Sequence, residues 1–556
     1  MEKRFIGHFL LFLGGGVAYL KKHWIKVLLI LIMLSSLGLM VFSSLSDSMV
    51  VDEKVHISAG YLHVWKGNYT FNPEHPPLLN DLAGLFAKIA KPNLPNVDLS
   101  LFKGDDQWQY GGKLFYESNN NVDSLLFWAR FPFILLTLGI IYLSYLWAKT
   151  IFNPKAGIVA AALVGFCPNI LAHGHLATTD IGLVFFLLLA CWLLRNYLLK
   201  ASFERAILLG LLIGLVILAK FSGIIIIPIV IIGLIWLWIF RRPKILSALG
   251  QLAIIVILPI AMVWLVYAFS MRSDLALLPK KYQLSSSLGS YGITSNIAKT
   301  LLVPFDKYFI GYNLVADHNA VGHWNFLNGQ IKFDGWWYYF PLALLYKLPI
   351  PTLILLALAV IFNRPKIREL FFLLLPALLF LGVAMTSRID IGIRHILVIL
   401  PFFYIYVAGL WQSKNIYLKP VISILLLATI IIGILAAPNY IAYFNQIAGG
   451  AKGGYKHLID SNLDWNQNIK RFAKYAKENN IRYIYQYCWD GSSFAYYGIE
   501  NQLLPTTPIN GVVAICAHQY WIKYDYDFSW VEKHWPPDDI ISNGVYVWRF
   551  DKKNVQ

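Results

Sequence analysis

Apolar runs long enough to cross a membrane recur along this chain and constrain its fold more than any other feature. A helix needs about 20 mostly apolar residues to span the roughly 30 Å of hydrocarbon in a bilayer. About 11 such runs are found, some of them short, at 24–45, 125–148, 156–172, 180–199, 206–219, 224–240, 246–269, 338–362, 369–386, 395–411 and 420–437. Hydrophobic residues make up 58% and charged residues only 14%, which excludes a soluble fold. We therefore predict an all-α polytopic membrane protein.

Basic residues are distributed unevenly over the segments that connect these runs. If the N-terminus lies in the cytoplasm, the segments on that side hold 18 Lys and Arg residues but only the acids Glu2, Glu204 and Glu369. Lys and Arg are enriched on the cytoplasmic side of membrane proteins. The net charge of +17 is therefore a topology signal and gives no reason to expect nucleic-acid binding. We expect an integral multi-pass protein of the plasma (inner) membrane.

An odd number of crossings places the C-terminus outside the cytoplasm. We predict a cytoplasmic tail over 1–23, a transmembrane module over 24–437 with outer loops 46–124 and 270–337, and a small extracytoplasmic α/β domain over 438–556. The last segment combines a polar helical stretch, 466–479, with strand-like runs at 481–488, 511–516 and 545–550. Cys488 and Cys516 then lie outside, where they either form a disulfide or stay as buried strand cysteines.

An acidic pair, Asp52 and Glu53, follows the first apolar run by a few residues. Partial desolvation at a membrane surface raises the pKa of a carboxyl group, as a general base requires. The alternative is a charged stop at the end of a helix. His56 follows closely, and Glu74 and His75 stand before two prolines that begin an amphipathic stretch.

The segments Asp52-Glu53-x-x-His56 and Glu74-His75-Pro76-Pro77-Leu78 resemble the first outer loop of bacterial glycosyltransferases of the GT-C fold. The branch they resemble is the dolichyl-phosphate-mannose–protein mannosyltransferase-like one, and more distantly the aminoarabinose transferases that modify lipid A. The resemblance covers most of residues 45–470. Further segments that match in order are Ala177–Asp180, Leu218–Ser222, Tyr346–Pro351, Ile391–Leu397, Asn439–Asn445 and Asp460–Trp465.

The resemblance implies an inverting transferase that moves a sugar, a hexose or a pentose, from a polyprenyl phosphate to an acceptor hydroxyl on the extracytoplasmic face. Asp52 is then the general base and Glu53 orients the base or the acceptor, although the reverse assignment stays open. The leaving phosphate needs cations. The candidates are Arg130, Lys220, Arg394 and Arg388, with snorkelling to lipid head groups as the alternative role.

Contacts to the sugar or the acceptor are expected from four further side chains, namely His56, Glu74, His75 and Asp180. Glu74 and His75 are equally compatible with capping the interfacial helix. His173 and His175 next to Asp180 raise the alternative of a metal site, but hydrogen-bonded loop histidines are favoured and no metal or cofactor is expected. Asp464 is expected to cap the polar helix that follows it.

Two functions from other classes compete with the transferase. A transporter or flippase for lipid-linked sugars would place polar groups along a path through the bilayer, whereas ionisable residues near mid-span are sparse here. A non-catalytic scaffold of the same fold would not need both Asp52 and Glu53. The sequence leaves open which sugar is moved, whether the acceptor is a protein, a lipid or a glycan, and the oligomeric state.

Overall fold

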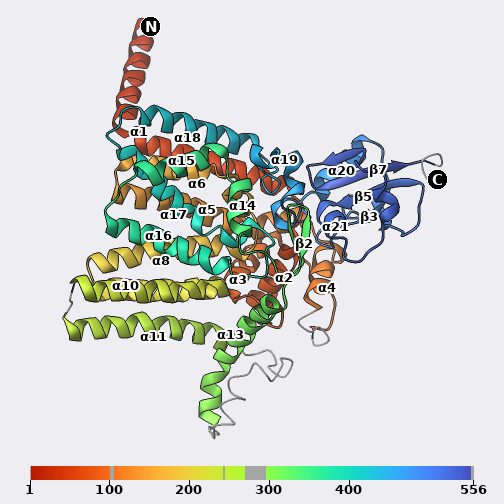
Figure 1. The fold of residues 1–556 in the computed structure, drawn as a ribbon, viewed down its shortest axis with the longest axis horizontal. Helices are drawn as coiled ribbons and strands as arrows, with labels where there is room; N and C mark the ends of the chain where they lie inside the picture. The colour runs from red at the N-terminus through yellow and green to blue at the C-terminus, as the bar shows by residue number, and fades with distance from the viewer. Residues whose placement is uncertain (1, 100–105, 242–243, 270–295, 552–556) are drawn as a thin grey trace.

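The computed structural model describes residues 2–99, 106–241, 244–269 and 296–551. Long helices lie side by side and form the larger part of the molecule, and a small sheet domain lies at one end of them (Figure 1). Part of the expected loop 270–337, residues 270–295, lies outside the described residues.

The helices of the bundle follow the predicted apolar runs closely. They are α1 (Glu2–Ser46), α5 (Val122–Ile151), α6 (Pro154–Gly165), α7 (Pro168–Gly174), α8 (Thr179–Leu199), α9 (Phe203–Ala219), α10 (Ile226–Arg241), α11 (Ile245–Phe269), α14 (Tyr339–Lys347), α15 (Ile350–Phe362), α16 (Ile367–Ala384), α17 (Ile399–Ala408) and α18 (Leu418–Leu435). The predicted fold class, a helical membrane protein with a small C-terminal α/β region, is confirmed.

Within the described ranges, seven helices are long and apolar enough to cross a membrane. Two bent pairs raise this number to nine: α6 with α7, bent by 63°, and α14 with α15, bent by 117°. Pro168 is the first residue of α7, Pro349 directly precedes α15, and Pro351 lies in its first turn; the missing N–H and the fixed φ angle of proline end one helix and favour the start of the next. Two further runs form the shorter helices α9 and α17, so the total of about 11 crossings stays a prediction.

Short elements lie between the bundle and the sheet domain (Figure 1). They include the helices α2 (Val51–Lys66), α3 (Pro77–Ala87) and α4 (Gln107–Gly112), the hairpin β1 (Asn325–Leu327)–β2 (Gln330–Lys332), and short turns of helix at η5 (Phe221–Ile225), η9 (Ile393–Ile396), η13 (Asp460–Asn462) and α19 (Gly450–Gly453). The longer helix α13 (Asn296–Val321) extends away from both the bundle and the sheet domain (Figure 1).

α2 and α3 cross at two glycines, and this crossing positions side chains of the site described below. A Cβ atom on Gly60 would lie 1.7 Å from the carbonyl oxygen of Asn80, and one on Gly84 would lie 2.0 Å from the carbonyl carbon of Gly60. Any larger residue at either position would force the two backbones apart. The contact brings Asn80 of α3 against His56 of α2.

The C-terminal domain contains a five-stranded sheet in the order β4-β3-β5-β7-β6. The strands β3 (Tyr483–Tyr487), β4 (Glu500–Leu503), β5 (Gly511–Cys516), β6 (Asp539–Ile541) and β7 (Val545–Phe550) are accompanied by the helices α20 (Ile469–Glu478), α21 (Ala517–Ile522) and α22 (Ser529–Glu532). β3 pairs in parallel with β4 and β5, whereas β7 lies antiparallel between β5 and β6.

The predicted strands and the polar helix of this domain are confirmed. α20 buries Ile469, Phe472 and Ala476, whose spacing places them on one helix face, against Ile484 and Val547 of the sheet. Cys488 and Cys516, for which two states were possible, form a disulfide that joins the end of β3 to β5. The boundaries chosen for the domains stay a prediction.

Candidate functional site

Four charged side chains from distant parts of the sequence meet at the end of the bundle nearest the C-terminal domain. Asp52 lies in the first turn of α2 and Asp180 in the first turn of α8. Lys220 ends α9 and Arg394 lies in η9. We call these four residues the charged cluster; all four were predicted from the sequence as site residues.

The charged cluster is a chain of ion pairs. Lys220 Nζ lies 2.6 Å from Asp180 Oδ1, and Arg394 Nη1 lies 3.6 Å from Asp180 Oδ2 and 3.2 Å from Asp52 Oδ2. The exposed fraction of the side chain is 27% for Asp52 but only 3% for Asp180. Two carboxylates thus balance two cations, and Asp52 is the acid that keeps an accessible surface.

Two predicted histidines lie beside this cluster. His56 Nδ1 lies 2.8 Å from Asn80 Oδ1, and the His56 ring meets the His75 ring edge to face at 4.7 Å between centroids. His75 Nδ1 is 2.8 Å from the side-chain oxygen of Asn72. Burial lowers the pKa of His56 against the opposing effect of Asp52, and burial holds the pKa of His75 well below its usual range. Both rings are therefore neutral at pH 7 and act as hydrogen-bonding groups.

Glu74 is held near the two histidines by a glutamine from α4. Gln107 Nε2 donates to Glu74 Oε1 over 2.7 Å, and the side-chain oxygen of Gln107 accepts from the backbone N–H of Asn72. The loop that bears Glu74 and His75 precedes α3, and these two hydrogen bonds with Gln107 of α4 hold it in place. The structure brings seven of the ten predicted site residues into one region.

Glu53 and Arg130 form a separate, fully buried pair. Arg130 Nε and Nη2 donate to the two carboxylate oxygens of Glu53 over 2.7 and 2.6 Å, and neither side chain has any exposed surface. The same carboxylate also accepts from the backbone N–H groups of Val50 and Ala177. This arrangement fits a structural role for Glu53 and leaves it no free oxygen to orient an acceptor.

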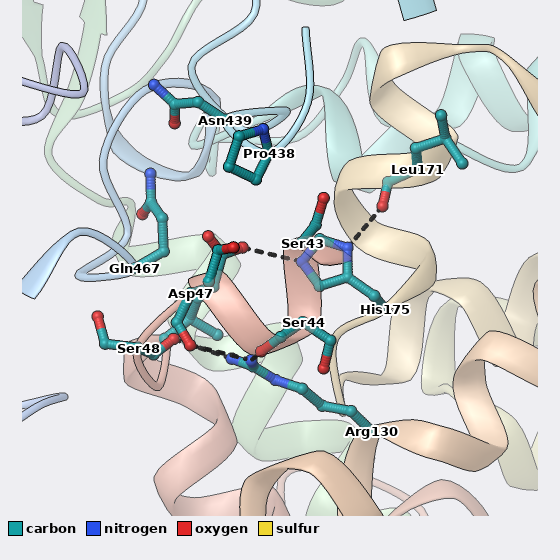
Figure 2. Close-up of polar contacts among 12 residues, drawn as sticks. Ser43, Ser44, Asp47, Ser48, Arg130, Leu171, His175, Pro438, Asn439 and Gln467 are labelled. Atoms are coloured by element: carbon teal, nitrogen blue, oxygen red, sulfur yellow. Dashed lines mark hydrogen bonds and ion pairs between the residues drawn. The ribbon is translucent and has the colours of Figure 1, made fainter. Parts of the chain in front are cut away.

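The remaining donors of Arg130 hold the link between α1 and α2 (Figure 2). They bind the carbonyl oxygens of Ser44, Asp47 and Ser48. With every donor used by the protein and no surface exposed, Arg130 does not reach a donor phosphate in this structure. Its predicted phosphate contact therefore does not fit the geometry, because a cation that must neutralise a buried carboxylate is not available to a ligand.

Arg388, the fourth predicted cation, lies apart from the charged cluster. Its side chain is 51% exposed, donates to the carbonyl oxygen of Ala320 over 2.8 Å and lies 3.9 Å from Asp334. It stabilises the end of α13 and the adjoining hairpin, and a phosphate contact is not supported by this position.

Of the two histidines that precede Asp180, His175 is hydrogen-bonded as expected, whereas within the described residues His173 Nδ1 is buried without a hydrogen-bond partner and the His173 ring packs against Trp465. His175 Nε2 lies 2.9 Å from Asp47 Oδ2 and His175 Nδ1 lies 2.7 Å from the carbonyl oxygen of Leu171 (Figure 2). Asp47 also pairs with Arg471 of α20. Although burial raises the pKa of Asp47, Arg471 and the hydrogen bond from His175 outweigh it and the pKa is lowered. Over the part of the chain that the structure describes, no three His, Cys, Asp or Glu side chains are grouped to hold a metal ion.

Sequence reasoning missed the contacts that the segment 460–465 makes with Arg394. Ser461 Oγ accepts from Arg394 Nε over 3.1 Å, and the guanidinium lies 4.2 Å from the centre of the Trp465 ring. The sequence singled out Ser461 and Trp465 only through a family resemblance, because no feature of the neighbouring sequence indicates that they contact Arg394. The helix cap expected at Asp464 is wrong: α20 begins at Ile469 after Asn468.

The geometry thus defines an integral membrane protein with a charged cluster at one end of its helices. Residues 122–267, which include Asp180 and Lys220, match the family model described as dolichyl-phosphate-mannose-protein mannosyltransferase. The resemblance predicted from the sequence is confirmed over this stretch. No protein matches among the curated sequences.

Solved structures of related type are similar at low identity. ArnT from Cupriavidus metallidurans, solved with undecaprenyl phosphate, is 11% identical with a TM-score of 0.47, over 95% of this chain and 99% of that chain. AglB, an oligosaccharyltransferase from Archaeoglobus fulgidus, is 14% identical with a TM-score of 0.45, over 88% and 60%. The protein O-mannosyltransferase complex Pmt1-Pmt2 from S. cerevisiae is 18% identical with a TM-score of 0.34, over 46% and 34%.

Proposed function

We propose that the protein is an inverting glycosyltransferase that moves a sugar from a polyprenyl-phosphate donor to an acceptor hydroxyl on the extracytoplasmic side of the plasma membrane. The observation that carries this proposal is the charged cluster, in which one partly exposed carboxylate, Asp52, pairs with Arg394, and Asp180 links Arg394 to the second cation, Lys220. The family match over 122–267 supports the same reaction class.

Asp52 is the general base of this reaction. A base must come within hydrogen-bond reach of the acceptor hydroxyl, and Asp52 has exposed surface whereas Glu53 has none. The acceptor oxygen attacks the anomeric carbon and its proton passes to the Asp52 carboxylate. The bond from that carbon to the phosphate oxygen breaks on the opposite side, and the phosphate leaves with the electron pair.

Lys220 and Arg394 stabilise the leaving phosphate. A phosphate departs as an anion, so preorganised cations lower the barrier and no general acid is needed. An incoming donor phosphate competes with Asp52 for the guanidinium of Arg394, because one Nη atom of that arginine serves Asp52 and Asp180. Donor binding thereby frees the Asp52 carboxylate for the acceptor proton.

The sugar or the acceptor is contacted by three polar side chains beside the charged cluster, namely His56, Glu74 and His75. Two neutral imidazoles recognise hydroxyl groups without competing for the phosphate charge. Asp180 orients both cations from its buried position. The disulfide between Cys488 and Cys516 is consistent with an oxidising, extracytoplasmic location for the C-terminal domain.

The test is transfer from a synthetic polyprenyl-phosphate sugar by the purified full chain, with Asp52→Asn as the variant. We expect transfer to fall by at least about a hundredfold while donor binding persists. Glu117→Gln is the matched control, because Glu117 is an exposed acid outside the charged cluster and pairs with Lys113. Full activity of Asp52→Asn would contradict the proposal. Mass spectrometry of membranes with and without the gene identifies the sugar and the acceptor class.

A further inference from the structure

One short segment of the chain contacts Arg394 directly and binds the backbone next to Asp52, the other partner of the Asp52–Arg394 ion pair. Residues 461–467 lie between the membrane module and the C-terminal sheet and are buried throughout. Neither Asp52 nor Arg394 belongs to this segment, and each approaches it from a different part of the sequence.

On the arginine side, the segment holds both the side chain and its loop. Ser461 Oγ accepts from Arg394 Nε over 3.1 Å and donates to the carbonyl oxygen of Ile391 over 2.7 Å. The side-chain oxygen of Asn462 accepts from the backbone N–H of Ile393 over 3.0 Å. The ring of Trp465 lies 4.2 Å from the guanidinium. The direction of the guanidinium is thus fixed by a hydroxyl on one atom and an aromatic ring beside it.

On the aspartate side, the same segment holds the start of α2. The carbonyl oxygen of Trp465 accepts from the backbone N–H of Val51 over 3.2 Å, one residue before Asp52. The carbonyl oxygen of Gln467 accepts from Ser48 N over 3.0 Å, and Ser48 Oγ donates to the carbonyl oxygen of Asn466 over 2.8 Å. Figure 2 shows Gln467 beside Asp47 and Ser48, the residues of this link between α1 and α2.

The segment is itself tied to the bundle. Lys347 Nζ, which is buried, donates to the carbonyl oxygens of Asn462 and Ile441 over 2.7 Å each. The side-chain nitrogen of Asn462 also donates to the Tyr339 hydroxyl over 2.9 Å. A rigid support of this kind is what a precisely oriented charged pair requires.

We propose that Ser461 is a positioning residue that sets the direction of the Arg394 guanidinium, and that segment 461–467 thereby controls how the donor phosphate is held and when Asp52 is released. This inference rests on the proposed function, since it assigns Arg394 to the donor phosphate. The C-terminal domain is then part of the active site's support and is not an appended module.

A substitution at Gly392 offers an independent way to disturb the hydrogen bond between Ser461 and Arg394. A Cβ atom at this position would lie 2.1 Å from Ser461 Oγ, so Gly392→Ala would displace the hydroxyl without altering Ser461. The backbone there is extended, with a φ of 166°, and alanine adopts it without strain.

The experiment is a double-mutant cycle that combines Ser461→Ala with Arg394→Lys in the purified full chain, using a synthetic polyprenyl-phosphate sugar as donor. With Arg394 present, Ser461→Ala should raise the donor KM and lower kcat/KM about tenfold, the usual loss for a hydrogen bond to a charged group. The acceptor KM should stay unchanged. With Lys at position 394, which has no Nε to hold, the same substitution should change kcat/KM less than twofold.

Gly392→Ala should repeat the effect of Ser461→Ala in both backgrounds, and it decides the question if Ser461→Ala does not fold. Ser118→Ala is the matched control, since its hydroxyl donates to the carbonyl oxygen of Lys113 away from the cluster. Equal losses in both backgrounds, or a lower kcat with no change in donor KM, would overturn the positioning role. Wild-type transfer by Asp52→Asn and Arg394→Lys would instead overturn the proposed function.

Discussion

The guanidinium of Arg130 donates two parallel hydrogen bonds to the carboxylate of Glu53, and both side chains are completely buried. This pair joins α5 to the first turn of α2 and so fixes the backbone next to Asp52. Two adjacent acids in the sequence therefore have different tasks: Glu53 belongs to the framework and Asp52 faces the site.

We predict that Glu53→Gln destabilises the protein strongly, by about 3–5 kcal/mol, because it leaves the Arg130 charge buried without a partner. Thermal unfolding in detergent measures the loss. The double variant Glu53→Leu with Arg130→Met should recover part of this stability, since both charges are removed together. If the single variant unfolds at the wild-type temperature but no longer binds donor, Glu53 acts in the site after all.

We predict that Lys220→Gln weakens binding of the polyprenyl-phosphate donor about tenfold or more, since a charge-assisted contact to phosphate is lost. Lys220→Arg should retain most of the affinity because the charge stays. Titration of the purified protein with the donor, at low and high salt, measures both. Arg388→Gln is the control cation and should bind donor like the wild type, as its partners are Ala320 and Asp334.

We predict a pH-dependent stability that arises at Asp460. Burial raises the pKa of Asp460 to about 7, from a usual value of 3.8. Because the folded state holds this proton more tightly than the unfolded state, stability falls as the pH rises from about 4 to about 7 and then levels off. Asp460→Asn removes this titration, so its unfolding temperature relative to the wild type should be higher at pH 8 than at pH 5. A constant difference across that range would exclude Asp460 as the source.

We predict that the C-terminal domain faces the extracytoplasmic side. A single cysteine at Leu503 of β4, which is 57% exposed, should react with a membrane-impermeant thiol reagent in intact cells. A cysteine at Ile416, 73% exposed between α17 and α18, should react only after the membrane is opened. The native cysteines do not interfere, because Cys167 and Cys191 are buried and the other two form the disulfide. The reverse labelling pattern would invert the topology and remove the basis for an extracytoplasmic reaction.

The amino-acid sequence by itself indicated the helical membrane module, the small α/β domain and all four members of the charged cluster. These properties are local: apolar length defines a span, alternation in a short run defines a strand, and a motif such as Asp52-Glu53 is read directly. The separate tasks of the two acids were not readable in this way, because they depend on Arg130, which lies 77 residues further along the chain.

Only the tertiary structure showed that Arg130 is paired with Glu53 in the interior and that Arg388 lies apart from the charged cluster. It also showed that Ser461 and Trp465 contact the guanidinium of Arg394. The reason is physical: a charged side chain serves a ligand only if the fold leaves it a free donor and an open surface. Both depend on neighbours that the packing of distant segments brings together, and no periodicity or spacing in the chain records them.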